Sequence, residues 1–147
     1  MTSAAVAIAG SLTAAAAYAP AGAARVGIDA VHVPTWERHL RLGGDPLLNR
    51  TYTPEEIAFS AGRVERLAAR LAAKEAVLKA LGTGIRGIGL REVEIVSLST
   101  GRPTVTLHDR AADIATELEL ARIEIALCHE HAYALALAFG VVEGSHD

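Results

Sequence analysis

Two acidic residues in this sequence stand in surroundings that favour chemistry. Asp29 interrupts an apolar, β-branched stretch, where a buried carboxylate is costly unless it is paired or bound to a cation. Glu75 lies on a segment with helical periodicity, next to Lys74 and four residues before Lys79. Two carboxylates on separate elements suit Mg²⁺, which completes its shell with water and phosphate oxygens. Lysines beside such a site would neutralise phosphate charge, so these residues favour magnesium-assisted phosphoryl transfer.

Each of these residues also has a structural interpretation. Asp29 would suit a turn or the cap of a following helix. Glu75 and Lys79 share a helix face, where a solvated charge pair contributes only about 0.2–0.5 kcal/mol. Spacing alone therefore leaves both interpretations open.

A second group of candidates is the pair His129 and His131 near the end of the chain. Histidines two residues apart on a strand face the same way, which would permit a metal site with Asp29 or Glu75. No further Cys/His cluster completes a tetrahedral zinc set, and no nucleophile-elbow motif positions a serine for hydrolysis. His129 also suits a hydrogen bond to a reacting oxygen or a proton transfer.

Composition restricts the class of protein. The chain has 147 residues, enough for one domain with a real core, and its net charge of −3 provides no field to hold nucleic acid. The single cysteine, Cys128, excludes an internal disulfide and fits a reducing compartment, so we expect a cytoplasmic protein. Basic residues step along the central helical segment and form either a solvated face or a patch for an acidic partner: Arg63, Arg66, Arg70 and Lys74.

Residues 1–24 differ from the rest of the chain. Half of them are alanine, and none is Asp, Glu, Lys or Arg. We expect a flexible or marginally helical extension, with a signal peptide as the minority alternative because a positive n-region is missing. The apolar run is short and dilute for a membrane span. A wrongly chosen start codon or excision from a larger polypeptide would also account for it.

Residues 25–142 are predicted to form a single domain of the α+β class. We expect a strand over Arg25–Val33, a helix that begins with a capping box at Thr53 and Glu56, and a central helix from about Val64 to Leu81. The other predicted elements are a short helix after Pro34 that breaks at 43–46, a hairpin of strands 92–98 and 104–107, a helix over 109–119 capped by Asp109, strands over 122–127 and 132–142, and a frayed tail over 143–147.

Glycines punctuate the loop after the central helix. Gly82, Thr83 and Gly84 suit a helix C-cap, or a loop that cradles a nucleotide phosphate or base. Their spacing matches neither the P-loop nor the dinucleotide fingerprint.

Four stretches from about Arg25 to Phe139 resemble the holo-acyl-carrier-protein synthases, the small type of 4′-phosphopantetheinyl transferase. They read VGIDAVHVPTWERH, LAARLAAKEAVLKALGTG, GRPTVTLHDRA and IEIALCHEHAYALALAF. The GID and KEAxxKAxGTG elements are specific when they occur together. The resemblance implies transfer of the 4′-phosphopantetheine arm of coenzyme A to a serine of an apo acyl carrier protein, with release of adenosine 3′,5′-bisphosphate. It also implies an antiparallel sheet packed on a long central helix, in a homotrimer with active sites between subunits.

The resemblance assigns roles to residues of the coenzyme site. Asp29 and Glu75 match the magnesium ligands, and Lys74 and Lys79 match basic residues expected near the pyrophosphate. His129 matches a late histidine expected near the coenzyme and the reacting centre. The glycine loop around Gly82, Thr83 and Gly84 is expected to contact the coenzyme.

The resemblance also implies a surface for the carrier protein. Arg38 falls where the family has an arginine that grips the acidic carrier, and Arg63, Arg66 and Arg70 would steer it. Glu75 is the first candidate for the general base and His129 the second. The sequence does not distinguish a fatty-acid, polyketide or peptide-synthesis carrier.

Three departures from the family pattern leave the metal ligands in place. Leu71 stands where Phe is usual, Cys128 replaces a Ser before the late histidine, and Glu130 replaces an Asp after it. Two rival functions are a non-catalytic carrier-protein-binding module that kept the fold and a phosphotransferase of another kind.

Overall fold

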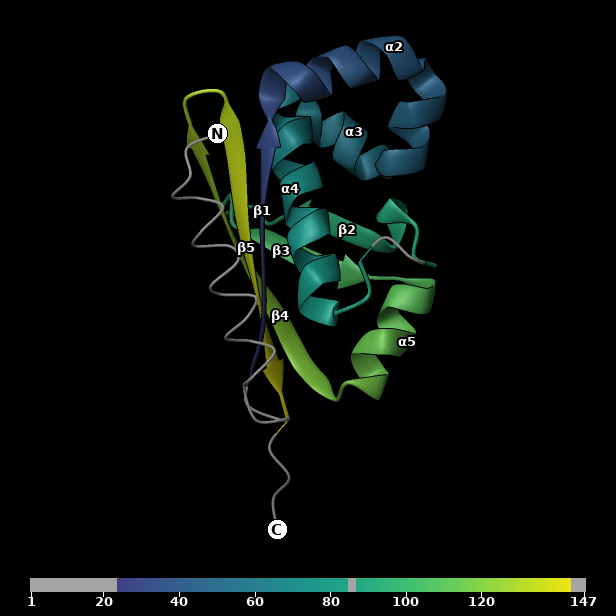
Figure 1. Cartoon of the computed structure of the whole chain (residues 1–147), viewed down its shortest axis with the longest axis vertical. Coiled ribbons are helices and arrows are strands. Elements are labelled where there is room, and N and C mark those ends of the chain that lie inside the picture. Colours follow the sequence, from purple (N-terminus) through teal and green to yellow (C-terminus); the bar gives the residue numbers. More distant parts are fainter. Residues whose placement is uncertain (1–23, 85–86, 144–147) are drawn as a thin grey trace.

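The structure is a computed structural model, which describes residues 24–84 and 87–143. The predicted extension, apart from Ala24, and the predicted tail beyond Glu143 lie outside these residues. The predicted α+β class, with an antiparallel sheet against a long central helix, is confirmed (Figure 1).

The main sheet joins the beginning of the domain to its end. Strands β1 (Ala24–His32), β5 (Tyr133–Val142) and β4 (Leu120–Glu130) are antiparallel and lie in the order β1-β5-β4. Asp29 lies inside β1, opposite Ala136 of β5, so the alternative that it begins a turn or caps a helix is wrong. Ala136 is buried against the central helix, and residues opposite each other share a face. The Asp29 side chain therefore points toward that helix.

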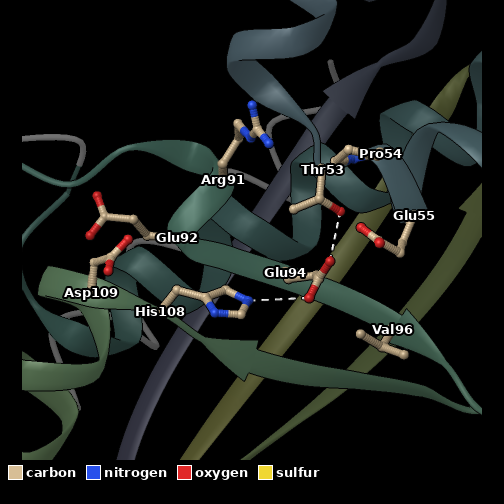
Figure 2. Close-up of a pocket in the computed structure, with 9 residues that line it drawn as sticks. All are labelled: Thr53, Pro54, Glu55, Arg91, Glu92, Glu94, Val96, His108 and Asp109. Atoms are coloured by element: carbon tan, nitrogen blue, oxygen red, sulfur yellow. Dashed lines mark hydrogen bonds and ion pairs between the residues drawn. The ribbon is translucent and has the colours of Figure 1, made fainter.

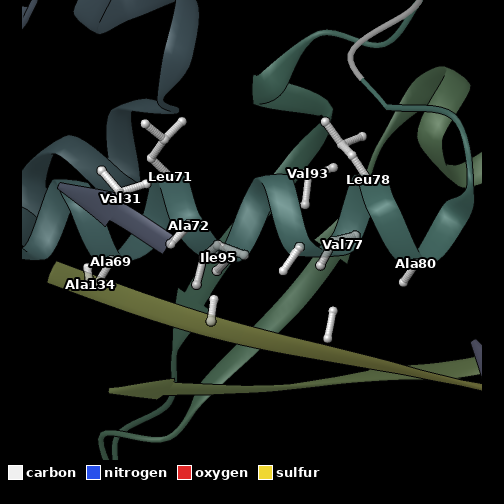
Figure 3. Packing of buried hydrophobic residues seen from close by; sticks show 14 of the residues in the cluster. Val31, Ala69, Leu71, Ala72, Val77, Leu78, Ala80, Val93, Ile95 and Ala134 are labelled. Carbon is white, nitrogen blue, oxygen red and sulfur yellow. The ribbon is translucent and has the colours of Figure 1, made fainter. Parts of the chain in front are cut away.

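Helix α4 (Val64–Leu81) is the element around which the domain packs. Its small side chains let β1 approach closely, and Figure 3 shows alanines such as Ala69 and Ala72 on its buried sides. A Cβ at Gly27 of β1 would lie only 1.8 Å from the Ala76 carbonyl oxygen. The Arg25 guanidinium adds a tie, because its Nε donates to the Ala80 carbonyl at 2.6 Å. Strand and helix thus run in near backbone contact beside Asp29.

Two helices precede α4. Helix α2 (Val33–Thr51) is kinked at Gly44, whose φ is 59°, so the break predicted at 43–46 is real but the helix resumes after it. Helix α3 (Pro54–Ser60) begins with the predicted capping box of Thr53 and Glu56. Together α2 and α3 cover the N-terminal part of α4 (Figure 1).

The middle of the chain packs against α4 and, through β3, against β4. The short helix η1 (Leu90–Glu92) leads into β2 (Val93–Ser97), which pairs with β3 (Pro103–Leu107) as the predicted hairpin. Helix α5 (Asp109–Glu117) follows. The predicted cap by Asp109 is wrong: Glu92 Oε1 accepts from the backbone N–H groups of Arg110 and Ala111 instead.

Within the described ranges, no helix combines the length and the apolar character that a membrane crossing requires.

Candidate active site

Asp29, Glu75 and Lys79 meet where β1 crosses α4. Lys79 Nζ donates to Asp29 Oδ1 at 2.9 Å and to the Ile28 carbonyl at 2.9 Å. The Asp29 side chain is 14% exposed and that of Lys79 is 47% exposed, so the lysine reaches from solvent onto a largely buried acid. Asp29 Oδ2 is buried and has no donor among the described residues other than a protonated Glu75. The structure thus brings both predicted metal ligands together within one chain.

The electrostatics of this pair favour a cation. The pKa of Glu75 is raised from its usual 4.5 to about 8, first by burial and then by the hydrogen bond to Asp29 and the negative charge of Asp29, while the charge of Lys79 lowers it. Two adjacent carboxylates cannot both ionise cheaply without a compensating positive charge. A divalent cation with oxygen ligands would supply that charge, and Mg²⁺ needs only one or two protein carboxylates. The residues present therefore fit the magnesium site that the sequence predicted.

The raised pKa of Glu75 gives a prediction for stability in metal-free solution. Between pH 4.5 and about 8 the native state holds a proton on Glu75 that the unfolded state has lost. The native state then binds more protons, so stability must fall as pH rises through this window. We expect the Tm measured with EDTA to decrease from pH 5.5 to 8.5, and Mg²⁺ to raise Tm more at pH 8.5 than at pH 5.5.

Two variants identify the source of this slope. Glu75→Gln cannot lose a proton and should flatten the decrease, whereas Glu65→Gln, at an exposed position of the same helix, should leave it unchanged. Equal slopes for Glu75→Gln and the original protein would show that Glu75 ionises normally.

Lys74 does not lie where the sequence placed it. Its side chain is fully buried, and Nζ donates to Glu56 Oε2 at 2.8 Å and to the carbonyls of Leu90 and Val93 at 2.9 and 2.8 Å. All three protons of the ammonium group are therefore used inside the protein. The structure contradicts the predicted contact of Lys74 with a pyrophosphate, because α4 turns this side chain away from Asp29 and into the interior.

The predicted arginine stripe is only partly on the surface. Arg63 is exposed and Arg66 is half-buried, but Arg70 is only 4% exposed. The Arg70 guanidinium lies 4.0 Å from the ring centroid of Phe59 and donates to Ser97 Oγ at 2.9 Å. Burial lowers the pKa of Arg70. The prediction that Arg70 steers a carrier protein is therefore wrong, because Phe59 covers it.

The histidines near the end of β4 do not form a metal site with the acids. His129 is the last but one residue of β4 and pairs with Ala134, one side-chain row beyond Asp29 and two strands away. Strand spacings put the two backbones roughly 12 Å apart. His131 lies in the turn with a φ of 53°, so the two histidines do not share a strand face as predicted. Among the described residues no group of three His, Cys, Asp or Glu could hold a metal, which removes the zinc hypothesis there.

The glycine loop begins as a helix cap. Gly82 has a φ of 80°, and its N–H donates to the Leu78 and Lys79 carbonyls. This confirms the structural interpretation of Gly82. Thr83 is half-buried and Gly84 is exposed, and the contact of this loop with a coenzyme stays a prediction.

A groove of about 770 Å³ lies on another part of the molecule, between the start of α3 and the β2–β3 hairpin (Figure 2). Glu94 sits in it, accepting from Thr53 Oγ1 at 2.7 Å and lying 3.2 Å from His108 Nε2. The hydrogen bond from Thr53 is the main cause that lowers the pKa of Glu94. Asp29 and Glu75 do not line this groove, and two of its own acids are engaged elsewhere: Glu94 pairs with Thr53 and His108, and Glu92 caps α5.

Sequence reasoning missed two residues that shape the site, Gly27 and Glu56. A glycine inside a strand pattern signals close approach of another backbone, so Gly27 carried a usable signal two residues before Asp29. Glu56 was assigned only to a capping box, and its pairing with Lys74 had no signal because the two are 18 residues apart on different helices.

Comparisons with known proteins show the family of this chain. The family described as the 4′-phosphopantetheinyl transferase superfamily matches residues 25–138. The holo-[acyl-carrier-protein] synthase of Gloeobacter violaceus is 43% identical over 116 residues, covering 76% of this chain and 88% of the relative. That of Moorella thermoacetica is 43% identical over 122 residues, covering 81% and 93%.

Solved structures give the same answer for the fold. The holo-[acyl-carrier-protein] synthase from Neisseria meningitidis superposes with a TM-score of 0.73 at 32% identity and covers 79% of this chain and 96% of its own. A structure described as the Chronobacterium ammoniagenes ACPS–CoA complex has a TM-score of 0.69 at 30% identity and covers 83% and 99%.

Proposed function

This chain belongs to the 4′-phosphopantetheinyl transferase superfamily, and we propose that Asp29 and Glu75 are the metal ligands of its active site. The chain is an enzyme that transfers the phosphopantetheine arm of coenzyme A to an apo acyl carrier protein. The observation that carries the assignment of the site is the contact of two carboxylates, one on β1 and one on α4, beside the half-exposed Lys79.

The residues of the site have different roles in phosphoryl transfer. Asp29 and Glu75 would hold Mg²⁺, which when bound neutralises pyrophosphate charge and orients its oxygens. Lys79 reaches solvent beside them and binds a phosphate oxygen of the coenzyme. The carrier's serine oxygen attacks the phosphorus that bears the pantetheine arm, and adenosine 3′,5′-bisphosphate leaves.

The serine must lose its proton during this attack. Glu75 is the first candidate for the base within one chain, since it lies at the carboxylate pair beside Lys79, where the phosphates of the coenzyme are expected to bind. His129 lies two strands away from Asp29 and would serve a site only at its own end of the sheet.

The partners follow from exposed features of the fold. Arg38 and Arg63 are exposed and supply a surface for an acidic carrier protein.

Leu137 and Phe139 of β5 are 37% and 41% exposed on the sheet face away from α4, which supports a homotrimer that covers this face. Sedimentation analysis at micromolar concentration tests the trimer, and a monomer would contradict it. A cytoplasmic location is consistent with the free Cys128.

An intact-mass assay tests the function directly. With coenzyme A, Mg²⁺ and an apo carrier protein, the carrier should gain about 340 Da, the mass of the transferred arm. A panel of fatty-acid, polyketide and peptide-synthesis carriers identifies the preferred substrate. Binding of a carrier without any mass gain, under every divalent metal tried, would favour the non-catalytic alternative.

Charge reversal on α2 should weaken binding of the carrier protein and should not change binding of the coenzyme. We expect Arg38→Glu to raise the KM for the carrier about tenfold, with kcat unchanged, and to weaken the salt dependence of kcat/KM. Arg110→Glu on α5 makes the same change in net charge and serves as the control. An equal effect of both variants would show that only net charge matters and that α2 is not the docking surface.

A further inference from the structure

Lys74 is the most deeply buried cation of the described chain, and the proposed chemistry does not use it. Its Nζ connects three separate elements: Glu56 of α3, the Leu90 carbonyl of η1 and the Val93 carbonyl of β2. The Lys74 side chain has no exposed surface, and neither does that of Glu56. Burying such a pair is costly unless every donor and acceptor is satisfied.

Glu56 satisfies its share of this requirement. Its Oε2 accepts from the Thr53 N–H at 2.8 Å as well as from Lys74, and its Oε1 accepts from the Ile95 N–H at 2.9 Å. The start of α3, the middle of α4 and the strand β2 therefore meet at one pair of opposite charges. We call Lys74 and Glu56 the buried pair.

The position of Lys74 in the sequence connects this pair to the active site. Consecutive residues of a helix point about 100° apart, so pinning Lys74 to η1 and β2 fixes the direction in which Glu75 points. A rotation of α4 by about 20° would move a carboxylate held roughly 6 Å from the helix axis by about 2 Å. Displacements of about 1 Å are already sufficient to impair a catalytic arrangement.

We propose that Lys74 is a positioning residue: the buried pair holds the rotation of α4 so that the Glu75 carboxylate faces Asp29. Through the Leu90 carbonyl, the same lysine also anchors the far end of the loop that starts at Gly82. The inference rests on the proposed function for the role of Asp29 and Glu75, but not for the buried pair itself. A direct phosphate contact by Lys74 would require breaking all three of its hydrogen bonds.

A double-mutant cycle on the full chain tests this role. The variants are Lys74→Met, Glu56→Gln and the two combined, and the readouts are the Tm and the dissociation constant of Mn²⁺ measured by electron paramagnetic resonance. We expect each single variant to weaken Mn²⁺ binding about tenfold, as loss of residues behind metal ligands commonly does. The combined variant should be no weaker than the worse single one, because the pair acts as a unit. Glu56 lies on α3 and contacts Lys74 of α4. Any effect of Glu56→Gln on the Mn²⁺ dissociation constant is therefore expected to come from a change in the position of α4.

A stability control separates positioning from general loosening. Ile114→Ala removes a buried side chain of α5 and should lower the Tm without changing the Mn²⁺ dissociation constant. Unchanged Mn²⁺ binding in Lys74→Met and Glu56→Gln, with binding by the original protein intact, would overturn the positioning role. Weaker Mn²⁺ binding in Lys74→Met, together with unchanged Mn²⁺ binding in Glu56→Gln, would also overturn the positioning role. That result would favour a direct contact of Lys74 with the ligand. Mn²⁺ binding that needs Asp29, without any mass gain on a carrier, would instead remove the proposed function and leave the buried pair in place.

Discussion

Removing either acid of the carboxylate pair is expected to stop transfer almost completely. Asp29→Asn and Glu75→Gln keep the shape of each side chain but remove the negative charge that holds the cation. Metal stabilisation of a transferring phosphoryl group contributes several kcal/mol, and about 4 kcal/mol corresponds to a thousandfold change in rate. We therefore expect at least about a thousandfold loss of kcat/KM in the intact-mass assay.

Stability shows whether this loss comes from unfolding. Glu75→Gln should have a higher Tm than the original protein at pH 8.5 in EDTA, because it removes a carboxylate whose pKa is raised by burial and by Asp29. Asp113→Asn, at an exposed position of α5, is the matched control and should keep full activity. Full activity in Asp29→Asn or Glu75→Gln would remove the metal site from the account of the reaction.

The second large effect is expected at Gly27, where β1 touches α4. A methyl group at this position would lie 1.8 Å from the Ala76 carbonyl oxygen and 2.8 Å from the Ala80 nitrogen. Both are backbone atoms of a helix, which cannot move aside as a flexible side chain would. Overpacking a well-packed core costs about 1–3 kcal/mol, and we place Gly27→Ala at or above about 3 kcal/mol of lost stability, measured by urea unfolding.

Gly140 provides the matched control for this prediction. It lies on β5 and its added Cβ would meet the Leu120 Cδ2 atom at 3.1 Å, the end of a flexible side chain. We expect Gly140→Ala to cost less than about 1 kcal/mol, because the end of the half-buried Leu120 side chain can shift, whereas the helix backbone beside Gly27 cannot. Similar costs for both variants would mean that the spacing of β1 and α4 is not set by Gly27.

The residues alone made Asp29 and Glu75 candidates for a shared magnesium site, and the resemblance to the family assigned them to it together. Asp29 was recognisable because a carboxylate in an apolar strand demands a partner, and Glu75 because helical spacing placed it beside Lys79. Their contact itself depends on the antiparallel register of β1 with β5 and on the close approach at Gly27. Neither the register nor the approach follows from local pattern.

Two basic residues were misplaced because helical periodicity does not say what covers a helix face. Lys74 and Arg70 are four residues apart, and both are buried and hydrogen-bonded to β2. Lys74 is neutralised by Glu56 and Arg70 is covered by Phe59, and both partners come from α3. A charged residue surrounded by alanines and leucines therefore indicated a specific role. The sequence did not show whether the side chain contacts a ligand in the active site or is buried next to the site.

The position of β1 has a consequence for synthesis of the protein. In the described part of the chain β1 pairs only with β5, and the register joins Ala24 to Val141. The ribosome releases Asp29 early, but its strand stays without a neighbour until the final strand has emerged. Because β5 is the strand that pairs with β1, the sheet that holds Asp29 beside α4 cannot be completed before residues 133–142 have been made. A nascent chain stalled before Tyr133 would carry both acids and still be inactive.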